Sequence, residues 1–179
     1  MKIAVLGGSG FLGSHLCDLL SSKGYNVNIL DKEKSKYKKK NQKMYVGSIL
    51  DRKKLSLAIK GCDFVYLFAA LADLGVAATR PPETAKVNIV GTINALTVSR
   101  EHGVKRFIYA SSIYANTEEG GFYGSSKKAA EDYIERFHAT FGLNYTILRF
   151  GSLYGSRSDE SNELNVIINS GLKKKIIKF

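Results

Sequence analysis

The stretch that decides the fold is Gly7-Gly8-Ser9-Gly10-Phe11-Leu12-Gly13. A short apolar run at residues 3–6 precedes it, and a helical pattern follows it. In this context Gly7 permits a tight turn, Gly10 lets the backbone approach a pyrophosphate, and Gly13 lets the helix pack closely on the sheet. The helix N-terminus adds partial positive charge. The stretch therefore predicts a dinucleotide-binding turn, with a glycine-rich turn without a ligand as the alternative.

Short apolar runs alternate with helical patterns along the chain. The six expected strands are Ile3–Leu6, Val27–Leu30, Met44–Val46, Phe64–Phe68, Phe107–Tyr109 and Tyr145–Leu148. Several of these runs are continuous, as in strands buried on both faces. Apolar residues recur at helical spacing in three sets: Leu12, Leu16, Leu19 and Leu20; Ile89, Ile93 and Leu96; Ala130, Tyr133, Ile134, Phe137 and Phe141. The alternation predicts an α/β fold, a Rossmann-like doubly wound parallel sheet with helices on both faces.

Asp31 ends the second expected strand and is the acidic partner of the glycine turn. An aspartate at this place accepts hydrogen bonds from the adenosine ribose hydroxyls and repels a 2′-phosphate. This favours NAD over NADP as the cofactor. Lys32 and Lys34 stand close enough to weaken that preference.

Tyr123 and Lys127 are spaced so that both side chains lie on one face of an expected helix. A free phenol has a pKa near ~10 and is a poor base at neutral pH. A nearby ammonium would lower that pKa and make tyrosine an effective acid/base group. In an arbitrary chain, a surface tyrosine and lysine would be the better interpretation. The Ser111-Ser112 end of the preceding strand favours the functional pair.

Further motifs follow in order: Phe68-Ala-Ala-Leu-Ala72, Asn88-Ile-Val-Gly-Thr-Ile-Asn94, Arg106-Phe-Ile-Tyr-Ala-Ser-Ser112, Tyr123-Gly-Ser-Ser-Lys127 and Leu148-Arg-Phe-Gly-Ser-Leu-Tyr-Gly155. Together with the glycine spacing, they resemble the extended short-chain dehydrogenase/reductases. That family comprises NAD-dependent nucleotide-sugar epimerases and dehydratases. The resemblance covers residues 1 to about 157. It implies a nucleotide-sugar substrate and NAD as cofactor.

The resemblance also implies roles for single residues. Tyr123 would exchange a sugar hydroxyl proton while hydride passes to or from the nicotinamide, and Lys127 would also bond the nicotinamide ribose. Ser112 would orient the reacting oxygen, with Ser111 as the alternative. The implied cofactor contacts are Gly7, Gly10, Phe11, Leu12, Gly13, Asp31, Ser48, Ile49, Phe68, Ala69, Ala70, Ala72, Asn88, Tyr123, Lys127 and Phe150; the implied substrate contacts are Ser112 and Asn162. For Asn88, a buried polar role in a helix is the alternative.

Two departures from the family pattern refine the expected activity. Ser48 stands where the family often has aspartate, so its contact with adenine would be weaker. Ile113 and Tyr114 stand where the 4,6-dehydratases place an Asp-Glu acid pair. Without that pair dehydration lacks its proton donor. We therefore expect an epimerase or a related oxidoreductase rather than a dehydratase.

The length of 179 residues suits one domain of ordinary size. The resemblance divides it into an NAD(P)-binding domain at residues 1–157 and, at residues 158–179, the beginning of an otherwise missing C-terminal substrate-binding lobe. That second segment is expected to contain a helix at residues 164–172. Two alternatives remain: a non-catalytic NAD(P)-binding sensor or scaffold on the same fold, or an inactive truncated enzyme.

The net charge of +11 comes mainly from two local patches. Residues 32–43 hold seven lysines and one glutamate, and residues 173–178 hold four lysines. Tyr37 is the one aromatic residue in the first run, so it offers no stacking platform for nucleic acid. We expect a solvated loop there and no nucleic-acid partner.

The remaining expectations concern compartment, metals and assembly. No apolar run approaches the length of a membrane span. The two isolated cysteines, Cys17 and Cys62, favour a reducing cytoplasm, and the scattered histidines argue against a metal site. The resemblance implies a homodimer that pairs the helices near residues 83–102 and 122–141.

Overall fold

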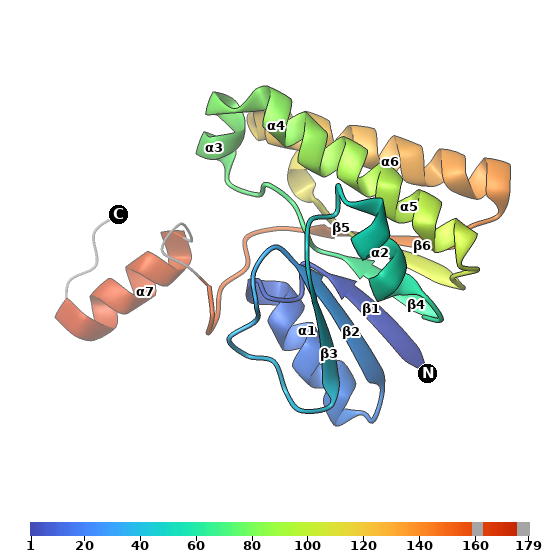
Figure 1. Ribbon diagram of the computed structural model, residues 1–179. Coiled ribbons are helices and arrows are strands. Elements are labelled where there is room, and N and C mark those ends of the chain that lie inside the picture. Colours follow the sequence, from blue (N-terminus) through green and yellow to red (C-terminus); the bar gives the residue numbers. More distant parts are fainter. Residues whose placement is uncertain (159–162, 175–179) are drawn as a thin grey trace.

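Six parallel strands form one sheet in the computed structural model, which describes residues 1–158 and 163–174 (Figure 1). The strands are β1 (Lys2–Leu6), β2 (Asn26–Asp31), β3 (Gln42–Val46), β4 (Phe64–Leu67), β5 (Arg106–Ser112) and β6 (Tyr145–Phe150). Their order is β3-β2-β1-β4-β5-β6, so the chain winds outward in opposite directions from β1. This arrangement confirms the Rossmann-like doubly wound sheet and opens a crevice at the carboxyl ends of β1 and β4.

The helices connect these strands. They are α1 (Phe11–Ser22), α2 (Arg52–Ile59), α3 (Leu74–Thr79), α4 (Pro81–Ala85), α5 (Gly91–Glu101), α6 (Gly121–Phe141) and α7 (Glu163–Lys174). Shorter turns are the π-helical η1 (Lys86–Val90) and the 3-10 turns η2 (Ile113–Asn116) and η3 (Glu118–Gly120). Helix α7 lies to one side of the strands (Figure 1).

Both faces of the sheet carry buried apolar side chains, as predicted. On one face, α2, α5 and α6 cover a cluster that includes the fully buried Phe107 and Leu67. On the other face, Cys17 and Leu20 of α1 pack on apolar residues of β1 and β2, among them Val5. Because burial of apolar area is the main favourable term in folding, these two layers fix the position of the strand ends that carry the site.

Two of the predicted helical stripes are only partly buried. Leu19 of α1 and Tyr133 and Phe141 of α6 are exposed, although the apolar spacing placed them toward the core. In α1, Cys17 is buried although it was not part of the predicted apolar stripe. The stripe in α6 is wider than the strip of helix that faces the sheet, so its outer members reach solvent.

A π-helical turn interrupts the helix expected near residues 83–102. The structure shows α4, then η1, then α5, with Pro81 and Pro82 in the first turn of α4. The wider turn of η1 contains Asn88, which is buried. A π-bulge of this kind is often found at functional sites.

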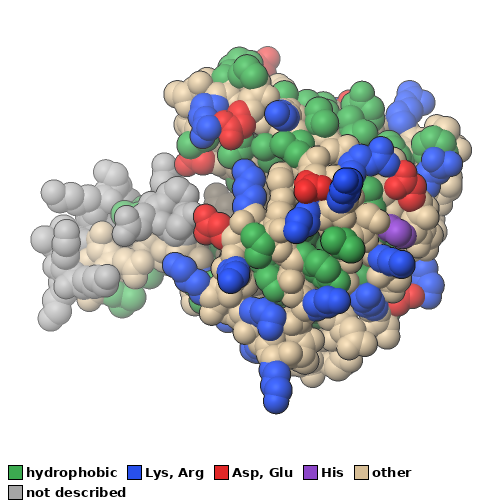
Figure 2. Space-filling view, in the orientation of Figure 1, with side chains coloured by type: hydrophobic (Ala, Val, Ile, Leu, Met, Phe, Trp, Pro, Cys, Tyr) green, Lys and Arg blue, Asp and Glu red, His purple; other side chains and the backbone are tan. Residues whose placement is uncertain are grey.

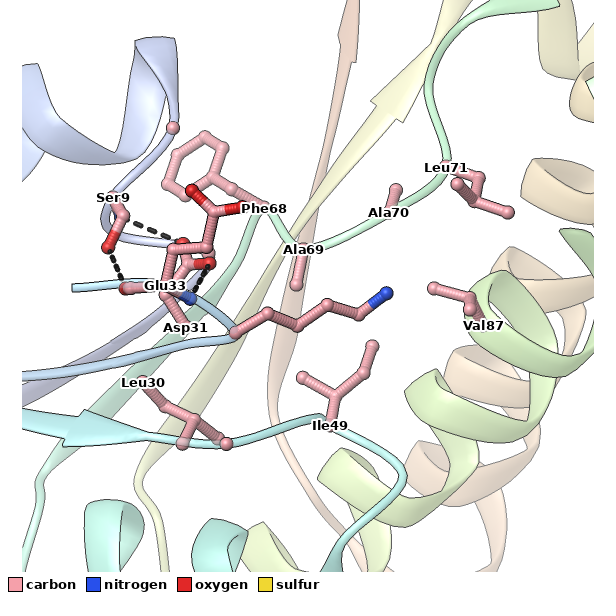
Figure 3. A pocket seen from close by; sticks show the side chains of 14 residues that line it. Ser9, Leu30, Asp31, Glu33, Ile49, Phe68, Ala69, Ala70, Leu71 and Val87 are labelled. Atoms are coloured by element: carbon pink, nitrogen blue, oxygen red, sulfur yellow. Dashed lines mark hydrogen bonds between the residues drawn. The ribbon is translucent and has the colours of Figure 1, made fainter. Parts of the chain in front are cut away.

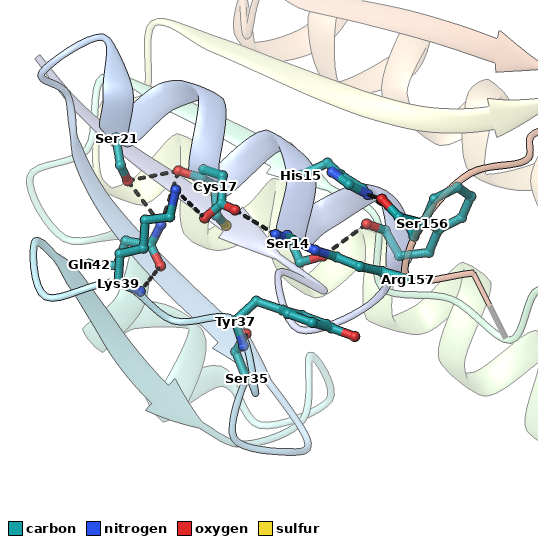
Figure 4. Close-up of polar contacts among 12 residues, drawn as sticks. Ser14, His15, Cys17, Ser21, Ser35, Tyr37, Lys39, Gln42, Ser156 and Arg157 are labelled. Atoms are coloured by element: carbon teal, nitrogen blue, oxygen red, sulfur yellow. Dashed lines mark hydrogen bonds and ion pairs between the residues drawn. The ribbon is translucent and has the colours of Figure 1, made fainter.

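The segment after β6 runs back across α1 (Figure 4). His15 and the backbone oxygen of Ser156 lie 2.7 Å apart, and Arg157 donates to Asp18 at 2.7 Å. Arg157 also stacks over the Tyr37 ring, 4.2 Å from its centroid. These contacts tie the end of residues 151–158 to α1 and to the lysine-rich loop.

Lysine and arginine side chains gather over the lower half of the face seen in Figure 2, where β3 and the loop before it lie. Lys39, in the lysine-rich run at residues 32–43, forms an ion pair with Asp18 at 3.4 Å. Within residues 1–158 and 163–174, no helix has the length and apolar character needed to cross a membrane.

Candidate cofactor and active site

The glycine turn is packed so tightly that two of its glycines have no room for a side chain. A Cβ on Gly13 would meet the Gly7 backbone oxygen at 2.1 Å, and a Cβ on Gly7 would meet the Ala69 backbone nitrogen at 2.4 Å. Gly7 also has a φ of +88°, which favours glycine. These contacts press α1 against β1 and the loop that follows β4.

Gly10 differs from Gly7 and Gly13 because a Cβ there would meet no clash. The nearest atom would be the Gly7 oxygen at 3.6 Å, an ordinary van der Waals contact. Gly10 is also the N-cap of α1, no side chain caps it, and the first turn of α1 has no acidic residue. The positive end of the helix therefore stays available to an anion.

The first cavity has a volume of about 310 Å³ and lies beside the glycine turn. Its lining is Gly7, Ser9, Gly10, Leu30, Asp31, Lys32, Glu33, Gly47, Ile49, Phe68, Ala69, Ala70, Leu71 and Val87. Figure 3 shows Ser9, Asp31 and Glu33 on one side of it and Leu71 and Val87 on the other. Asp31 accepts a hydrogen bond from the Ser9 backbone N–H at 2.9 Å, so its carboxylate is held at the rim.

A second cavity, of about 270 Å³, joins the glycine turn to the Tyr–Lys pair. Its lining is Gly7, Gly10, Phe11, Leu12, Gly13, Phe68, Ala70, Ala72, Ala110, Ser111, Ser112, Tyr123, Lys127, Phe150, Gly151 and Leu153. It shares Gly7, Gly10, Phe68 and Ala70 with the first cavity. The second cavity is thus lined by residues from the carboxyl ends of β1, β4, β5 and β6 and from helices α1 and α6.

Lys127 lies at the base of the second cavity and is buried. Its Nζ donates to the Ala110 backbone oxygen at 2.8 Å and lies 4.8 Å from the centroid of the Tyr109 ring. Burial lowers the pKa of Lys127 to about 7, against the opposing charge of Glu131. The side chain therefore changes charge in the physiological range.

The pKa of Tyr123 runs against the sequence-based expectation. Burial raises it, and a hydrogen bond from Ser112 opposes the rise. The expected lowering by Lys127 is not seen, because Nζ lies 5.6 Å from the Tyr123 ring centroid and points to a backbone oxygen instead. In the folded chain, Ser112 is thus the group that favours the phenolate.

Ser48 and Asn88 do not line the cavities of the described chain, although both were candidate cofactor contacts. The Ser48 hydroxyl accepts from the Leu50 N–H at 3.1 Å and closes a turn. The Asn88 amide bonds both backbone groups of Leu71 and donates to Ser126 at 2.9 Å. In the structure Asn88 therefore has a buried polar role in the helix, and it holds the backbone of Leu71, which lines the first cavity.

A buried carboxylate near the Tyr–Lys pair was missed in the sequence. Glu131 is fully buried and accepts hydrogen bonds from Arg149 and from Ser111. Its signal was available, because Glu131 follows Lys127 by one helical turn. Ser9, Leu71 and Val87 were also missed, since contact through the backbone or a generic apolar side chain leaves no motif.

A third cavity, of about 770 Å³, opens from the second toward α3 and α7. It shares Ser112 and Tyr123 with the second cavity and reaches Tyr114 and Leu164. It is wide enough for a sugar beside the Tyr123 hydroxyl. Asn162, the other candidate substrate contact, lies outside the described residues.

The residues present fit a dinucleotide. Gly10, which lines both cavities without a side chain, and the uncapped α1 suit a pyrophosphate, the carboxylate of Asp31 suits a ribose, and the second cavity extends to Tyr123. In the described part of the chain, no cluster of three or more His, Cys, Asp or Glu residues could hold a metal ion.

A comparison with protein families decides the relationship. The model of the NAD dependent epimerase/dehydratase family matches residues 3–178. The chain belongs to this family. This confirms the resemblance to the extended short-chain dehydrogenase/reductases.

Family members of known sequence and structure are similar over most of the chain. A putative UDP-glucose 4-epimerase of Methanocaldococcus jannaschii is 32% identical, with 92% of this chain and 60% of that protein covered. The structure of UDP-glucose 4-epimerase with UDP-glucose from Thermotoga maritima is 32% identical with a TM-score of 0.88, over 97% of this chain and 63% of that one. The UDP-glucose 4-epimerase complex with NAD from Thermus thermophilus is 29% identical with a TM-score of 0.85, over 94% and 61%. The chain thus spans about 60% of the length of such relatives.

Proposed function

We propose that the chain binds NAD and takes part in the epimerisation of a nucleotide-sugar, with Tyr123 as the acid/base group. One observation carries this proposal: a single cavity is lined both by the glycine turn and by Ser112, Tyr123 and Lys127. A dinucleotide bound along the turn would bring its reactive end to the Tyr123 hydroxyl. Family membership supports the same chemistry.

The proposed reaction removes the hydroxyl proton and the carbon-bound hydride of one sugar carbinol; the hydride then returns to the other face of the carbonyl carbon, and the proton returns to its oxygen. NAD, when bound, supplies the hydride acceptor and a positive charge. The Tyr123 oxygen takes the hydroxyl proton as phenolate and gives it back as phenol. The Ser112 hydroxyl, which favours the phenolate in the structure, would hold this oxygen in line. A protonated Lys127 stabilises the same negative charge.

The substrate class rests on two similar proteins whose structures contain UDP-glucose: the UDP-glucose 4-epimerase of Thermotoga maritima and the protein MoeE5. We propose a UDP-sugar for this chain. The third cavity, beside Ser112 and Tyr123, supports the placement of the sugar.

The test follows NADH binding by fluorescence and, with NAD supplied, the interconversion of UDP-glucose and UDP-galactose, because the proposed reaction returns the hydride and leaves no net NADH. We expect Tyr123→Phe to keep NADH affinity and to lose roughly 10²-fold or more in the rate of interconversion, as for loss of an acid/base group. Tyr45→Phe, on β3 and away from the cavities, is the matched control. Equal rates in the parent and Tyr123→Phe would reject the proposal. NADH binding without turnover by either protein would favour a non-catalytic dinucleotide sensor.

We also propose that NAD is preferred over NADP. The Asp31 carboxylate is held at the rim of the first cavity by the Ser9 N–H and would repel a 2′-phosphate. Lys32 lines the same cavity and acts in the opposite sense. A dissociation constant for NADPH equal to or below that for NADH would contradict this preference.

A homodimer through α5 and α6 is a further proposal. Val90, Phe122, Tyr133 and Phe141 are exposed apolar residues on or beside these helices. Exposed apolar patches of this kind often mark protein contacts. Light scattering at micromolar concentration should give twice the monomer mass, and Phe122→Glu should reduce it. A monomeric parent chain would overturn this proposal.

A further inference from the structure

The end of β5 and helix α6 are joined at three places. Three consecutive residues of the strand meet three residues of the helix that are each one turn apart: a hydrogen bond from Ser112 lowers the pKa of Tyr123 against burial, Lys127 donates to the Ala110 oxygen, and Ser111 donates to Glu131. The first two pairs belong to the proposed reaction. The third lies deeper in the molecule and has no part in it so far.

Glu131 is the carboxylate among these three helix residues, and its exposed fraction is 0%. Its two oxygens accept from Arg149 of β6, from Nε at 3.0 Å and from Nη2 at 2.6 Å, and one of them also accepts from the Ser111 hydroxyl. Burial opposes ionisation, but the bonds from Arg149 and Ser111 outweigh it and lower the pKa of Glu131. The side chain is therefore an anion that joins α6 to the carboxyl ends of β5 and β6.

A nearby anion favours the charged form of a buried lysine such as Lys127. The rings that face its ammonium are those of Tyr109 on β5 and Tyr123 on α6, both uncharged in their ordinary state. Glu131, one turn further along α6, acts on Lys127 in the direction that favours the proton. Arg149 on β6 is the positive charge paired with Glu131, and by Coulomb's law a cation beside the carboxylate offsets part of its effect on Lys127.

We propose that Glu131 is a positioning residue for the Tyr123–Lys127 pair: it holds α6 in register on the ends of β5 and β6, and its negative charge favours the protonated form of the buried Lys127 one turn away. This inference rests on the proposed function, because it assigns Glu131 to the same acid/base site. Glu131 is not part of the lining of the second cavity; it accepts from Ser111, which lines it, and lies one helical turn from Lys127.

The test is a pH titration of the Lys127 side chain by NMR in lysine-labelled protein, with the signal assigned by its loss in Lys127→Arg. In Glu131→Gln, which keeps the shape and loses the charge, we expect the pKa of Lys127 to fall by about one unit or more. Asp132→Asn is the matched control, because Asp132 is exposed and pairs with Lys128 on the outer face. It should leave the Lys127 titration unchanged.

A second variant predicts the opposite sign. Arg149→Gln removes a positive charge and leaves Glu131 in place, so the pKa of Lys127 should rise above that of the parent. Arg149 is 44% exposed, and its guanidinium can reach water in Glu131→Gln, which favours folding of that variant. A purely structural role for Glu131 would lower the melting temperature of both variants without opposite shifts of Lys127. Shifts of the same sign, or none in the variants that fold, would overturn the inference.

These measurements need neither cofactor nor substrate. Failure of the parent to bind NADH would therefore reject the proposed function without altering the titration of Lys127. Conversely, a parent that binds NADH and interconverts the two UDP-sugars by way of Tyr123, with a Lys127 titration indifferent to Glu131, would reject only the role of Glu131.

Discussion

Asn88 and Leu71 exchange two hydrogen bonds across 17 residues of chain. The Leu71 N–H donates to Asn88 Oδ1 at 2.8 Å, and Asn88 Nδ2 donates to the Leu71 oxygen at 3.0 Å. The amide of one buried side chain thus replaces a strand partner for the loop that follows β4. Because that loop supplies Phe68, Ala69, Ala70 and Ala72 to the cavities, its shape depends on a residue that does not face the cofactor site.

Removal of the Asn88 amide should therefore weaken both the fold and the site. Asn88→Ala leaves two backbone groups of Leu71 without their partners, so we expect a loss of about 1–3 kcal/mol in the free energy of unfolding. Urea denaturation measures it, and NADH affinity should fall as well. Asn94→Ala, at a half-buried position of α5, is the control and should cost clearly less. An unchanged urea midpoint in Asn88→Ala would contradict the bracing role.

Alanine at Gly10 and at Gly13 should have different effects. Gly13→Ala would drive a Cβ into the backbone of Gly7 and should lower the melting temperature strongly. Gly10→Ala makes no clash in the fold, and its methyl group would enter the cavities that Gly10 lines. It should keep the melting temperature and weaken NADH binding. Thermal unfolding and fluorescence titration of both variants separate the two effects; equal losses of stability would refute the distinction.

Lys127 should make stability depend on pH. The unfolded chain keeps the lysine proton up to a pKa of 10.5, whereas burial lowers the pKa in the folded chain to about 7. Between these values the unfolded state binds more protons, so the folded state gains stability as pH rises, by up to about 1.4 kcal/mol per pH unit. Below pH 7 both states carry the proton and this slope vanishes. Lys127→Met should lack the slope, which urea titrations of both proteins between pH 6 and 10 would show.

The two thiols should be inert in the folded chain. Burial raises the pKa of Cys17 to about 12 and that of Cys62 to about 11, so almost no thiolate forms near neutral pH. A thiol reagent at pH 8 should label neither cysteine within minutes and both after denaturation. Rapid labelling of native protein would contradict the burial of α1 on the sheet.

The strands and part of the lining of the cofactor cavity could be predicted because both depend on local sequence. Continuous apolar runs predicted buried parallel strands, and the glycine turn with Asp31 predicted the ribose end of the cavity. The Tyr123–Lys127 spacing likewise placed both side chains at one cavity.

The electrostatics of the site could not be predicted in the same way. Lys127 was expected to lower the pKa of Tyr123, but the sequence does not show that its ammonium bonds the Ala110 oxygen and is buried. Glu131 and Arg149 meet only because β6 pairs with β5 beside α6. The exposed Tyr133 and Phe141 show that an apolar stripe predicts a helix more securely than it predicts which members are buried.

The strand order has a consequence for biosynthesis. β1 lies inside the sheet, with β2 and β3 on one side and β4, β5 and β6 on the other. A chain that leaves the ribosome can therefore pair its first three strands, which carry the glycine turn and Asp31, before the remaining strands exist. The wall that carries Ser112 and Tyr123 arrives later, and the Glu131–Arg149 pair that fastens it forms only after β6 is made. The cofactor-binding turn is thus synthesised first, and the residues proposed for the acid/base step follow.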